Sequence, residues 1–260
     1  MNVLCIGDVV GNPGVECLRR QIPALRRKYA ADAVIVNAEN ADKTGTGLSR
    51  KLADELLCGG YADALTTGNH CFRRADATLY EECPTVLMPA NYPPLGMEVG
   101  CCTLDFGRIR LDVYNLQGTA FLEPLQNPFV VLDELLRRSA TKFRILDFHA
   151  EATAEKKAMA YYADGRVSAI FGTHTHVQTA DEQILPGGTG YITDAGMTGP
   201  MNSVLGVRPE LAVQRQSSHL PTRFDVADGP CALEGVLFRL DNATGRCIGV
   251  ERIRVQEGAR

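Results

Sequence analysis

Two histidines, His174 and His176, stand two residues apart directly after the apolar run 167–171. Such a run is typical of a buried strand, so both imidazoles are expected just beyond a strand end. In an open α/β sheet, ligands bind beyond the carboxyl ends of the strands. Imidazole is a common ligand of transition metals. The stretch therefore indicates a metal site, provided that other strand ends supply further ligands.

Polar side chains that can bind metal follow other strand-like segments in the same way. They are Asp8 after 3–7, Glu39 and Asn40 after 33–36, Asn69 and His70 after 62–66, and His149 after 144–148. Each alone has an ordinary explanation, because Asp and Asn are frequent in turns and a single histidine is more often a hydrogen-bonded polar residue. Their joint placement at strand ends, which a mainly parallel arrangement brings to one edge of the sheet, is what indicates a site.

The mixture of imidazole, carboxylate and amide groups limits the chemistry. Such a set suits manganese, iron, zinc or cobalt better than calcium or magnesium alone. The number of candidates exceeds the three or four ligands of a single tetrahedral site. It suits two metal ions ~3.5–4 Å apart and bridged by a carboxylate, an arrangement that stabilises the attacking and leaving oxygens in phosphoryl displacement.

The elements that must position these residues change character along the chain. Strands alternate with helices at first, which indicates βαβ units with parallel strands, and antiparallel strands follow from residue 222 onward. We therefore predict an α/β fold with either one mixed sheet or two sheets packed together. The predicted helices cover 12–29 (with Asn12 as N-cap), 50–58, 74–82, 128–140 and 153–162, and predicted strands include 85–88, 97–104, 108–116, 223–226, 231–240 and 247–255. No linker is evident, so we predict a single domain over residues 1–260.

Composition excludes several classes of function. The chain of 260 residues carries a net charge of −4, which argues against broad binding to duplex nucleic acid but permits a small phosphorylated ligand. Nine cysteines occur without a CxxC pair, which is typical of small buried residues in a reducing compartment. The sequence shows neither a signal peptide nor an apolar run of transmembrane length, so we expect a cytoplasmic protein without membrane contact.

Short blocks around the candidate ligands resemble those of the calcineurin-like metallophosphoesterases, and more closely those of the bacterial YmdB-like branch. The resemblance covers residues 1 to about 255. The blocks are Gly7-Asp8-Val9-Val10-Gly11, Asn37-Ala38-Glu39-Asn40, Gly68-Asn69-His70, Asn115-Leu116-Gln117-Gly118, Asp147-Phe148-His149-Ala150-Glu151-Ala152-Thr153, Gly172-Thr173-His174-Thr175-His176-Val177-Gln178-Thr179 and Thr193-Asp194-Ala195-Gly196-Met197-Thr198-Gly199-Pro200.

Two positions depart from the wider superfamily. Val10 stands where the first block usually has a histidine, and Glu39 stands where the second block usually has a bridging aspartate. The YmdB-like branch is similar to this sequence at both positions, with the amide of Asn40 replacing the missing histidine. The resulting first set of ligands is richer in oxygen, which favours iron, with manganese as the alternative.

The resemblance implies a four-layer αββα fold, in which two packed mixed β-sheets are flanked by helices. It also implies two metal ions and a separate acid. One ion would be held by Asp8, Glu39, Asn40 and His176, the other by Glu39, Asn69, His149 and His174, and His70 would protonate the leaving oxygen. The chemistry of imidazole permits this division, because a ligand histidine must be neutral whereas an acid must be protonated near the working pH.

The predicted function is that of a dinuclear metal-dependent phosphodiesterase, in which a metal-bridging hydroxide attacks phosphorus. The resemblance implies cyclic nucleotides as substrates, 2′,3′-cyclic and also 3′,5′-cyclic monophosphates. One alternative is a phosphomonoesterase or protein phosphatase with the same metals. Another is a regulatory protein that binds nucleotides or RNA without turnover, although His70 would then be superfluous. The sequence is compatible with a homo-oligomer but does not establish one.

Overall fold

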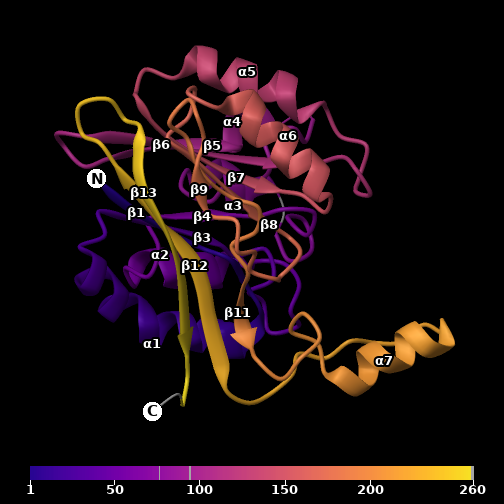
Figure 1. Ribbon diagram of the computed structural model, residues 1–260. Coiled ribbons are helices and arrows are strands. Elements are labelled where there is room, and N and C mark those ends of the chain that lie inside the picture. The colour runs from indigo at the N-terminus through magenta and orange to yellow at the C-terminus, as the bar shows by residue number, and fades with distance from the viewer. Residues whose placement is uncertain (76, 94, 259–260) are drawn as a thin grey trace.

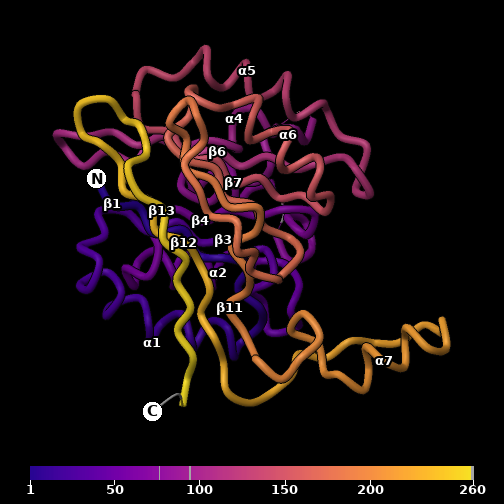
Figure 2. The backbone as a smooth tube through the Cα atoms, viewed as in Figure 1, coloured from indigo at the N-terminus to yellow at the C-terminus, as the bar shows by residue number. Residues whose placement is uncertain are grey.

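In the computed structural model, which describes residues 1–75, 77–93 and 95–258, two mixed β-sheets pack face to face and helices cover their outer faces (Figure 1). Figure 2 shows the same path as a continuous tube. The predicted four-layer αββα architecture is confirmed. The single-domain organisation stays a prediction.

The first sheet contains the strands nearest both ends of the chain. Its strand order is β2-β11-β12-β1-β3-β4, with β13 also paired to β12. The strands β1, β3 and β4 are parallel, whereas β12 is antiparallel to β1, β11 and β13. Their bounds are Asn2–Ile6 (β1), Asp8–Val9 (β2), Ala33–Asn37 (β3), Ala64–Thr66 (β4), Met197–Pro200 (β11), Cys231–Leu240 (β12) and Cys247–Gln256 (β13).

The second sheet is formed by the middle of the chain, in the order β5-β6-β7-β8-β10-β9. The strands β6, β7, β8 and β10 are parallel, and an antiparallel strand lies at each edge. The bounds are Cys101–Asp105 (β5), Arg110–Gln117 (β6), Phe143–His149 (β7), Ala169–Thr173 (β8), Gln183–Ile184 (β9) and Gly190–Ile192 (β10).

Alternation along the strands separates the buried side chains into layers. In β1, Val3 and Cys5 face the second sheet, whereas Leu4 and Ile6 face the helices on the other side. Helices α1 (Gly11–Tyr29), α2 (Arg50–Cys58) and α3 (Ala77–Glu82) cover the first sheet. Helices α5 (Pro128–Arg138) and α6 (Thr153–Ala163) cover the second sheet, where α4 (Gly96–Val99) also lies.

Several predicted elements differ from the structure. Helix α1 begins at Gly11, so Asn12 is inside the first turn and is not the N-cap. The segments 85–88 and 223–226 form isolated bridges, at Val86 and Val226, and are not strands. Residues 96–99 are helical, so β5 starts later than predicted. The predicted helix 74–82 is observed over Ala77–Glu82, and residue 76 lies outside the described part.

Helix α7 (Pro209–Ser218) was not predicted from the sequence, because its residues lack an apolar periodicity. Figure 1 shows this helix extending away from the body of the molecule. Within it Ala212 is buried, and Val213 is 60% exposed. A helix that does not pack against a core needs no apolar stripe, which removes the signal on which prediction depends. None of the helices in the described ranges is long and apolar enough to cross a membrane.

The candidate ligands do converge, but not on the edge of a single sheet as one reading of the sequence predicted. Strands β3 and β4 of the first sheet and strands β7 and β8 of the second sheet end at the same side of the molecule. Because the two sheets pack face to face, the loops after these four strands meet above the core. The site is therefore assembled between the two sheets.

Candidate metal centre

Each predicted site residue lies at or just beyond a strand end, and all of them gather in one place. Asp8 begins β2, which pairs with β11 in parallel. The others come from four strand ends: Glu39 and Asn40 after β3, Asn69 and His70 after β4, His149 as the last residue of β7, and His174 and His176 after β8. The structure therefore brings the predicted residues together, and their role as metal ligands stays a prediction.

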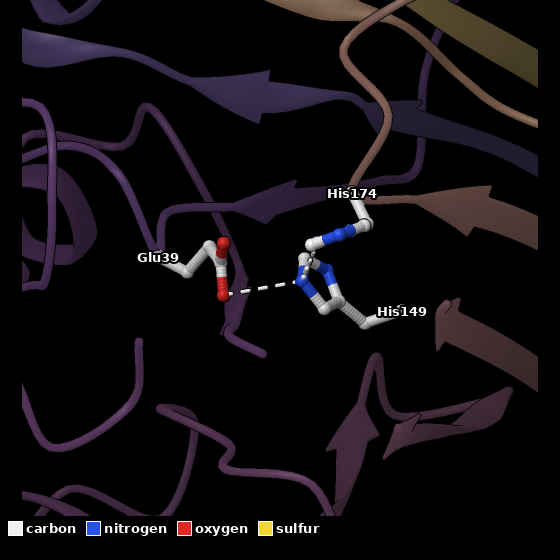
Figure 3. Close-up of side chains that lie close together, drawn as sticks. All are labelled: Glu39, His149 and His174. Atoms are coloured by element: carbon white, nitrogen blue, oxygen red, sulfur yellow. Dashed lines mark hydrogen bonds and ion pairs between the residues drawn. The ribbon is translucent and has the colours of Figure 1, made fainter. Parts of the chain in front are cut away.

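One group of ligand atoms centres on His149. The ligand atoms of Glu39, His149 and His174 lie within 4.8 Å of one another, and these side chains point toward one another in Figure 3. The distances to His149 Nε2 are 3.3 Å from Glu39 Oε2 and 3.1 Å from His174 Nδ1. Asn69 Oδ1 lies 3.0 Å from the same nitrogen. This group matches the set predicted for one of the two metals.

A second group centres on His176. Its Nε2 atom lies 3.7 Å from Asp8 Oδ1 and 3.0 Å from the amide nitrogen of Asn40. The same amide nitrogen donates to Glu39 Oε1 at 3.1 Å. Metal binding through Asn40 requires its amide oxygen, so the amide has to turn over when a cation occupies this position. Apart from that reversal, the group matches the set predicted for the other metal.

Glu39 lies between the two groups. Its Oε1 atom faces the amide of Asn40, and its Oε2 atom faces His149. The carboxylate is 1% exposed, so both oxygens are committed to the site and not to solvent. This is the position that a bridging carboxylate requires.

The protonation of His149 is set by a neighbouring hydroxyl. Thr173 Oγ1 donates to Asp147 Oδ1 at 2.7 Å and lies 2.9 Å from His149 Nδ1. Because the hydroxyl proton is directed to the carboxylate, the hydroxyl oxygen accepts from His149 Nδ1–H. The lone pair of His149 Nε2 then faces the ligand group, as metal binding requires.

The other two imidazoles are fixed in the same manner. His176 Nδ1 lies 3.1 Å from the carbonyl oxygen of Leu205, and His174 Nε2 lies 3.1 Å from Glu151 Oε2. Both partners are acceptors, so these ring nitrogens carry the protons. His176 Nε2 and His174 Nδ1 therefore present lone pairs to the site, like His149 Nε2.

The charges of the site fit a bound cation. Burial lowers the pKa of His149, but the Glu39, Asp8 and Asp147 charges outweigh it and raise that pKa to about 9. Without a metal ion, His149 Nε2 therefore binds a proton, and a cation at this place would displace that proton and bind the lone pair. Asp8 Oδ1 is buried and has no hydrogen-bond partner among the described residues. A metal ion bound to this oxygen would be the missing partner. The donor set therefore fits metal ions of the first transition row.

His174 stays neutral in this environment. Burial and the nearby His149 lower the pKa of His174 to about 3. A neutral imidazole is what metal binding requires, because the ligating nitrogen must keep its lone pair.

His70 occupies a different kind of position from the three other histidines of the site. Its Nδ1 atom lies 3.1 Å from Glu39 Oε1 and 2.9 Å from Asn40 Oδ1, both of which are acceptors. The proton on that nitrogen is therefore held, which leaves Nε2 to gain and lose a proton. The side chain is 25% exposed, so His70 lies at the rim of the site, where a substrate could reach it.

A glycine next to the ligands makes the packing of the site feasible. A Cβ atom at Gly68 would lie 2.1 Å from His149 Cδ2 and 2.4 Å from Glu39 Oε2. Both distances are far below van der Waals contact, so any side chain would displace a proposed ligand. This explains why glycine precedes Asn69 and His70.

Sequence reasoning did not identify the buried residues that support the ligands. Asn37 Nδ2 donates to Asp147 Oδ2 at 2.9 Å, which links the end of β3 to β7 across the two sheets. Thr66 also donates to Asp147 Oδ2. The available signal was the strand period of two, which places Asp147 on the same face of β7 as His149. A carboxylate on the buried face of an apolar strand is a sign of such a network.

Comparison with known proteins gave consistent matches over most of the chain. A family model described as YmdB-like protein matches residues 4–253. A 2′,3′-cyclic-nucleotide 2′-phosphodiesterase of Bacillus subtilis (strain 168) is 44% identical over 260 residues, covering 99% of this chain and 98% of the relative. These matches extend well beyond the blocks around the ligands.

Two solved structures superimpose closely on this chain. A hypothetical protein from Thermus thermophilus has a TM-score of 0.91 and 37% identity, with 99% of this chain and 100% of that chain covered. A novel phosphatase from Mycoplasma pneumoniae also has a TM-score of 0.91 and 37% identity, with 98% of this chain and 93% of that chain covered. The arrangement of two sheets is therefore common to this chain and both of these proteins.

Proposed function

The chain belongs to the YmdB-like protein family of the calcineurin-like metallophosphoesterases, and we propose that it is a dinuclear phosphodiesterase that hydrolyses cyclic nucleotides. The family resemblance predicted from the sequence is confirmed, as is the predicted class of enzyme, a metal-dependent phosphoric diester hydrolase. The number of metals, the roles of individual residues and the substrate are the proposed parts.

The observation that carries the dinuclear proposal is the position of Glu39 between two groups of ligand atoms. We assign Glu39 as the bridging ligand. Each proposed metal position is then completed by residues on one side of it. The first position has Asp8, Asn40 and His176 with Glu39, and the second has Asn69, His149 and His174 with Glu39.

When bound, two metal ions would activate a water for attack on phosphorus and neutralise the charge that develops on the phosphoryl oxygens. The protein contributes the positioning of these ions and the acid. His70 protonates the departing oxygen through Nε2, because its Nδ1–H is held by the carboxylate of Glu39. The held nitrogen also keeps the ring from turning away from the site.

The proposed substrates are cyclic nucleotides, foremost 2′,3′-cyclic and also 3′,5′-cyclic monophosphates. The name of the Bacillus subtilis relative, at 44% identity, supports the first of these. A monoesterase remains the second candidate, because the structural relative from Mycoplasma pneumoniae is described as a phosphatase. For the metal we propose iron, with manganese as the alternative, on the basis of the oxygen-rich first position.

Turnover of three substrates by the metal-loaded protein tests the proposal. These are 2′,3′-cyclic AMP, bis(p-nitrophenyl) phosphate as a simple diester, and p-nitrophenyl phosphate as a monoester. We expect hydrolysis of both diesters at a higher kcat/KM than the monoester. Cleavage of the monoester alone would reject the phosphodiesterase. Tight binding of the cyclic nucleotide without turnover would instead favour the regulatory binding protein.

A further inference from the structure

A buried ion pair lies next to the metal-binding turn without contributing a ligand atom to it. Lys156 in α6 and Asp194, which follows β10, are each 1% exposed, and Lys156 Nζ donates to Asp194 Oδ2 at 2.7 Å. Lysine is rarely buried to this extent, because removing its charge from water is unfavourable. Its presence here therefore requires an explanation.

Asp194 connects this ion pair to the turn. Its Oδ2 atom also accepts from the backbone N–H of Thr175 at 3.1 Å and from Thr175 Oγ1 at 2.7 Å. Its Oδ1 atom accepts from Gly196 N at 2.8 Å. Thr175 is the residue between His174 and His176, so the carboxylate holds the centre of the turn by both the backbone and the side chain.

The turn itself has an unfavourable backbone conformation. His174 has φ +100° and His176 has φ +61°, a region that residues with side chains seldom adopt. The consequence is that the two imidazoles diverge, with His174 directed to His149 and His176 directed to Asp8 and Asn40. A conformation of this kind persists only when its surroundings hold it.

The glycine at the start of the motif lets β8 approach the end of β10 closely. A Cβ atom at Gly172 would lie 1.8 Å from the carbonyl oxygen of Thr193 and 3.1 Å from Lys156 Cδ. The first distance is far below van der Waals contact, so a side chain at Gly172 would push away the backbone directly before Asp194. The motif from Gly172 to His176 therefore contains both the proposed ligands and the glycine that lets Asp194 lie close to them.

We propose that Lys156 and Asp194 are positioning residues that hold the turn from His174 to His176, so that its two imidazoles reach different metal ions. The inference rests on the proposed function, since it takes both histidines as metal ligands. Lys156 Nζ and both donors of Thr175 meet at Asp194 Oδ2, so the ion pair and the turn share one carboxylate oxygen.

The affinity of the purified chain for Mn²⁺, measured by titration, tests the inference without relying on activity. Thr175→Val removes the hydroxyl that Asp194 holds, and Thr175→Ser keeps it. Lys156→Met removes the buried charge at a similar side-chain length. Asp112→Asn is a matched control, because Asp112 is also buried and accepts from Thr103, Tyr114 and Ser139 at the opposite end of the second sheet.

We expect Thr175→Val and Lys156→Met to bind Mn²⁺ roughly 10- to 100-fold more weakly than wild type, the usual effect of losing a group that orients a ligand. Thr175→Ser and Asp112→Asn should bind like wild type. If Lys156→Met does not fold, the two Thr175 variants decide the question alone.

Wild-type affinity in Thr175→Val would overturn the inference, as would an equal loss in Asp112→Asn, which would indicate general loosening. If the wild-type chain binds fewer than two ions, the dinuclear proposal fails first, and the inference fails with it.

Discussion

His70 is the residue whose role is separate from metal binding, because its held Nδ1 and its exposed rim position suit proton transfer. We expect His70→Gln to lower kcat for 2′,3′-cyclic AMP by about 10²–10⁴-fold, the usual contribution of a general acid. Hydrolysis of bis(p-nitrophenyl) phosphate should fall much less, because p-nitrophenolate leaves without a proton. Steady-state kinetics on both substrates checks this.

The control for that prediction is the metal content of His70→Gln, which should equal that of wild type. Equal losses of kcat on the two diesters would mean that His70 does not act as the acid for the leaving group. A loss of metal would make it a ligand or a support for one.

Gly68 is required because a side chain there would collide with His149 and Glu39. We expect Gly68→Ala to fold but to bind metal at least about 10-fold more weakly, because at least one proposed ligand must shift. Gly249→Ala is the matched control, since a Cβ atom there would meet its nearest neighbours at an ordinary 3.5 Å. Mn²⁺ titration of both variants measures the effect, and undiminished binding in Gly68→Ala would contradict the proposed ligand geometry.

At the scale of elements, polar side chains fix the loops that follow the strands by hydrogen bonds, and Asp181 is an example. Its Oδ1 atom accepts from Thr179 Oγ1 at 2.7 Å and from Thr193 N at 3.1 Å, which joins the loop after β8 to the end of β10. Burial opposes ionisation of Asp181, but hydrogen bonds from the Thr193 hydroxyl, the Thr179 hydroxyl and the Thr193 backbone N–H outweigh it and lower its pKa. The loop that follows the metal-binding turn is therefore tied to the second sheet.

The lowered pKa has a defined consequence for stability. The folded protein holds the Asp181 proton less tightly than the unfolded chain, in which the pKa of an aspartate is about 3.9. Ionised Asp181 therefore adds to the free energy of unfolding above that pH, and this contribution is lost as the pH falls through the pKa of the folded state. We expect Asp181→Asn to cost about 1 kcal/mol at neutral pH, with allowance for solvent screening. Thermal unfolding across pH should show this difference shrinking below about pH 4.

The exposed Asp228 supplies a control for this series, because Asp228→Asn should leave stability nearly unchanged across the same pH range. A difference between Asp181→Asn and wild type that stays constant down to strongly acidic pH would show that the carboxylate charge is not what ties the loop.

At the scale of the whole molecule, the proposed ligands join the two sheets, so bound metal should stabilise the fold. Binding of one ion at a free metal concentration of about 100 times Kd adds about 2.7 kcal/mol to the free energy of unfolding. In a chain of this length, that corresponds to a fall of Tm by roughly 5 to 10 °C when metal is removed by a chelator. Calorimetry of metal-loaded and chelator-treated protein measures the shift, and an unchanged Tm would contradict a site that spans both sheets.

Much of this fold could be predicted because apolar runs and glycines mark the buried strands. The runs before Asp8, Glu39 and His149 are such cases, and they also placed the candidate ligands. Whether one sheet or two would form was left open by periodicity, because that depends on contacts between distant strands. Helix α7 was missed because it does not pack on the core.

The site was predicted less completely than the fold. Its proposed ligands stand in recognisable blocks, whereas the partners that orient them are spread over the chain. Asp147 and Lys156 each contact a group far away in sequence, the hydroxyl of Thr173 and the carboxylate of Asp194. Only the packing of α6 and the two sheets brings such pairs together, so they cannot be predicted from the spacing of residues in the sequence.

The most direct test of the dinuclear site is the metal content per chain of anaerobically purified protein, measured together with hydrolysis of 2′,3′-cyclic AMP. Glu39→Gln serves as the variant, since it keeps the shape of the bridging side chain and removes its charge. We predict two metal ions per wild-type chain, and fewer than two in Glu39→Gln with activity at least about 100-fold lower. Full activity with a single ion at saturation, or two ions and full activity in Glu39→Gln, would contradict the account.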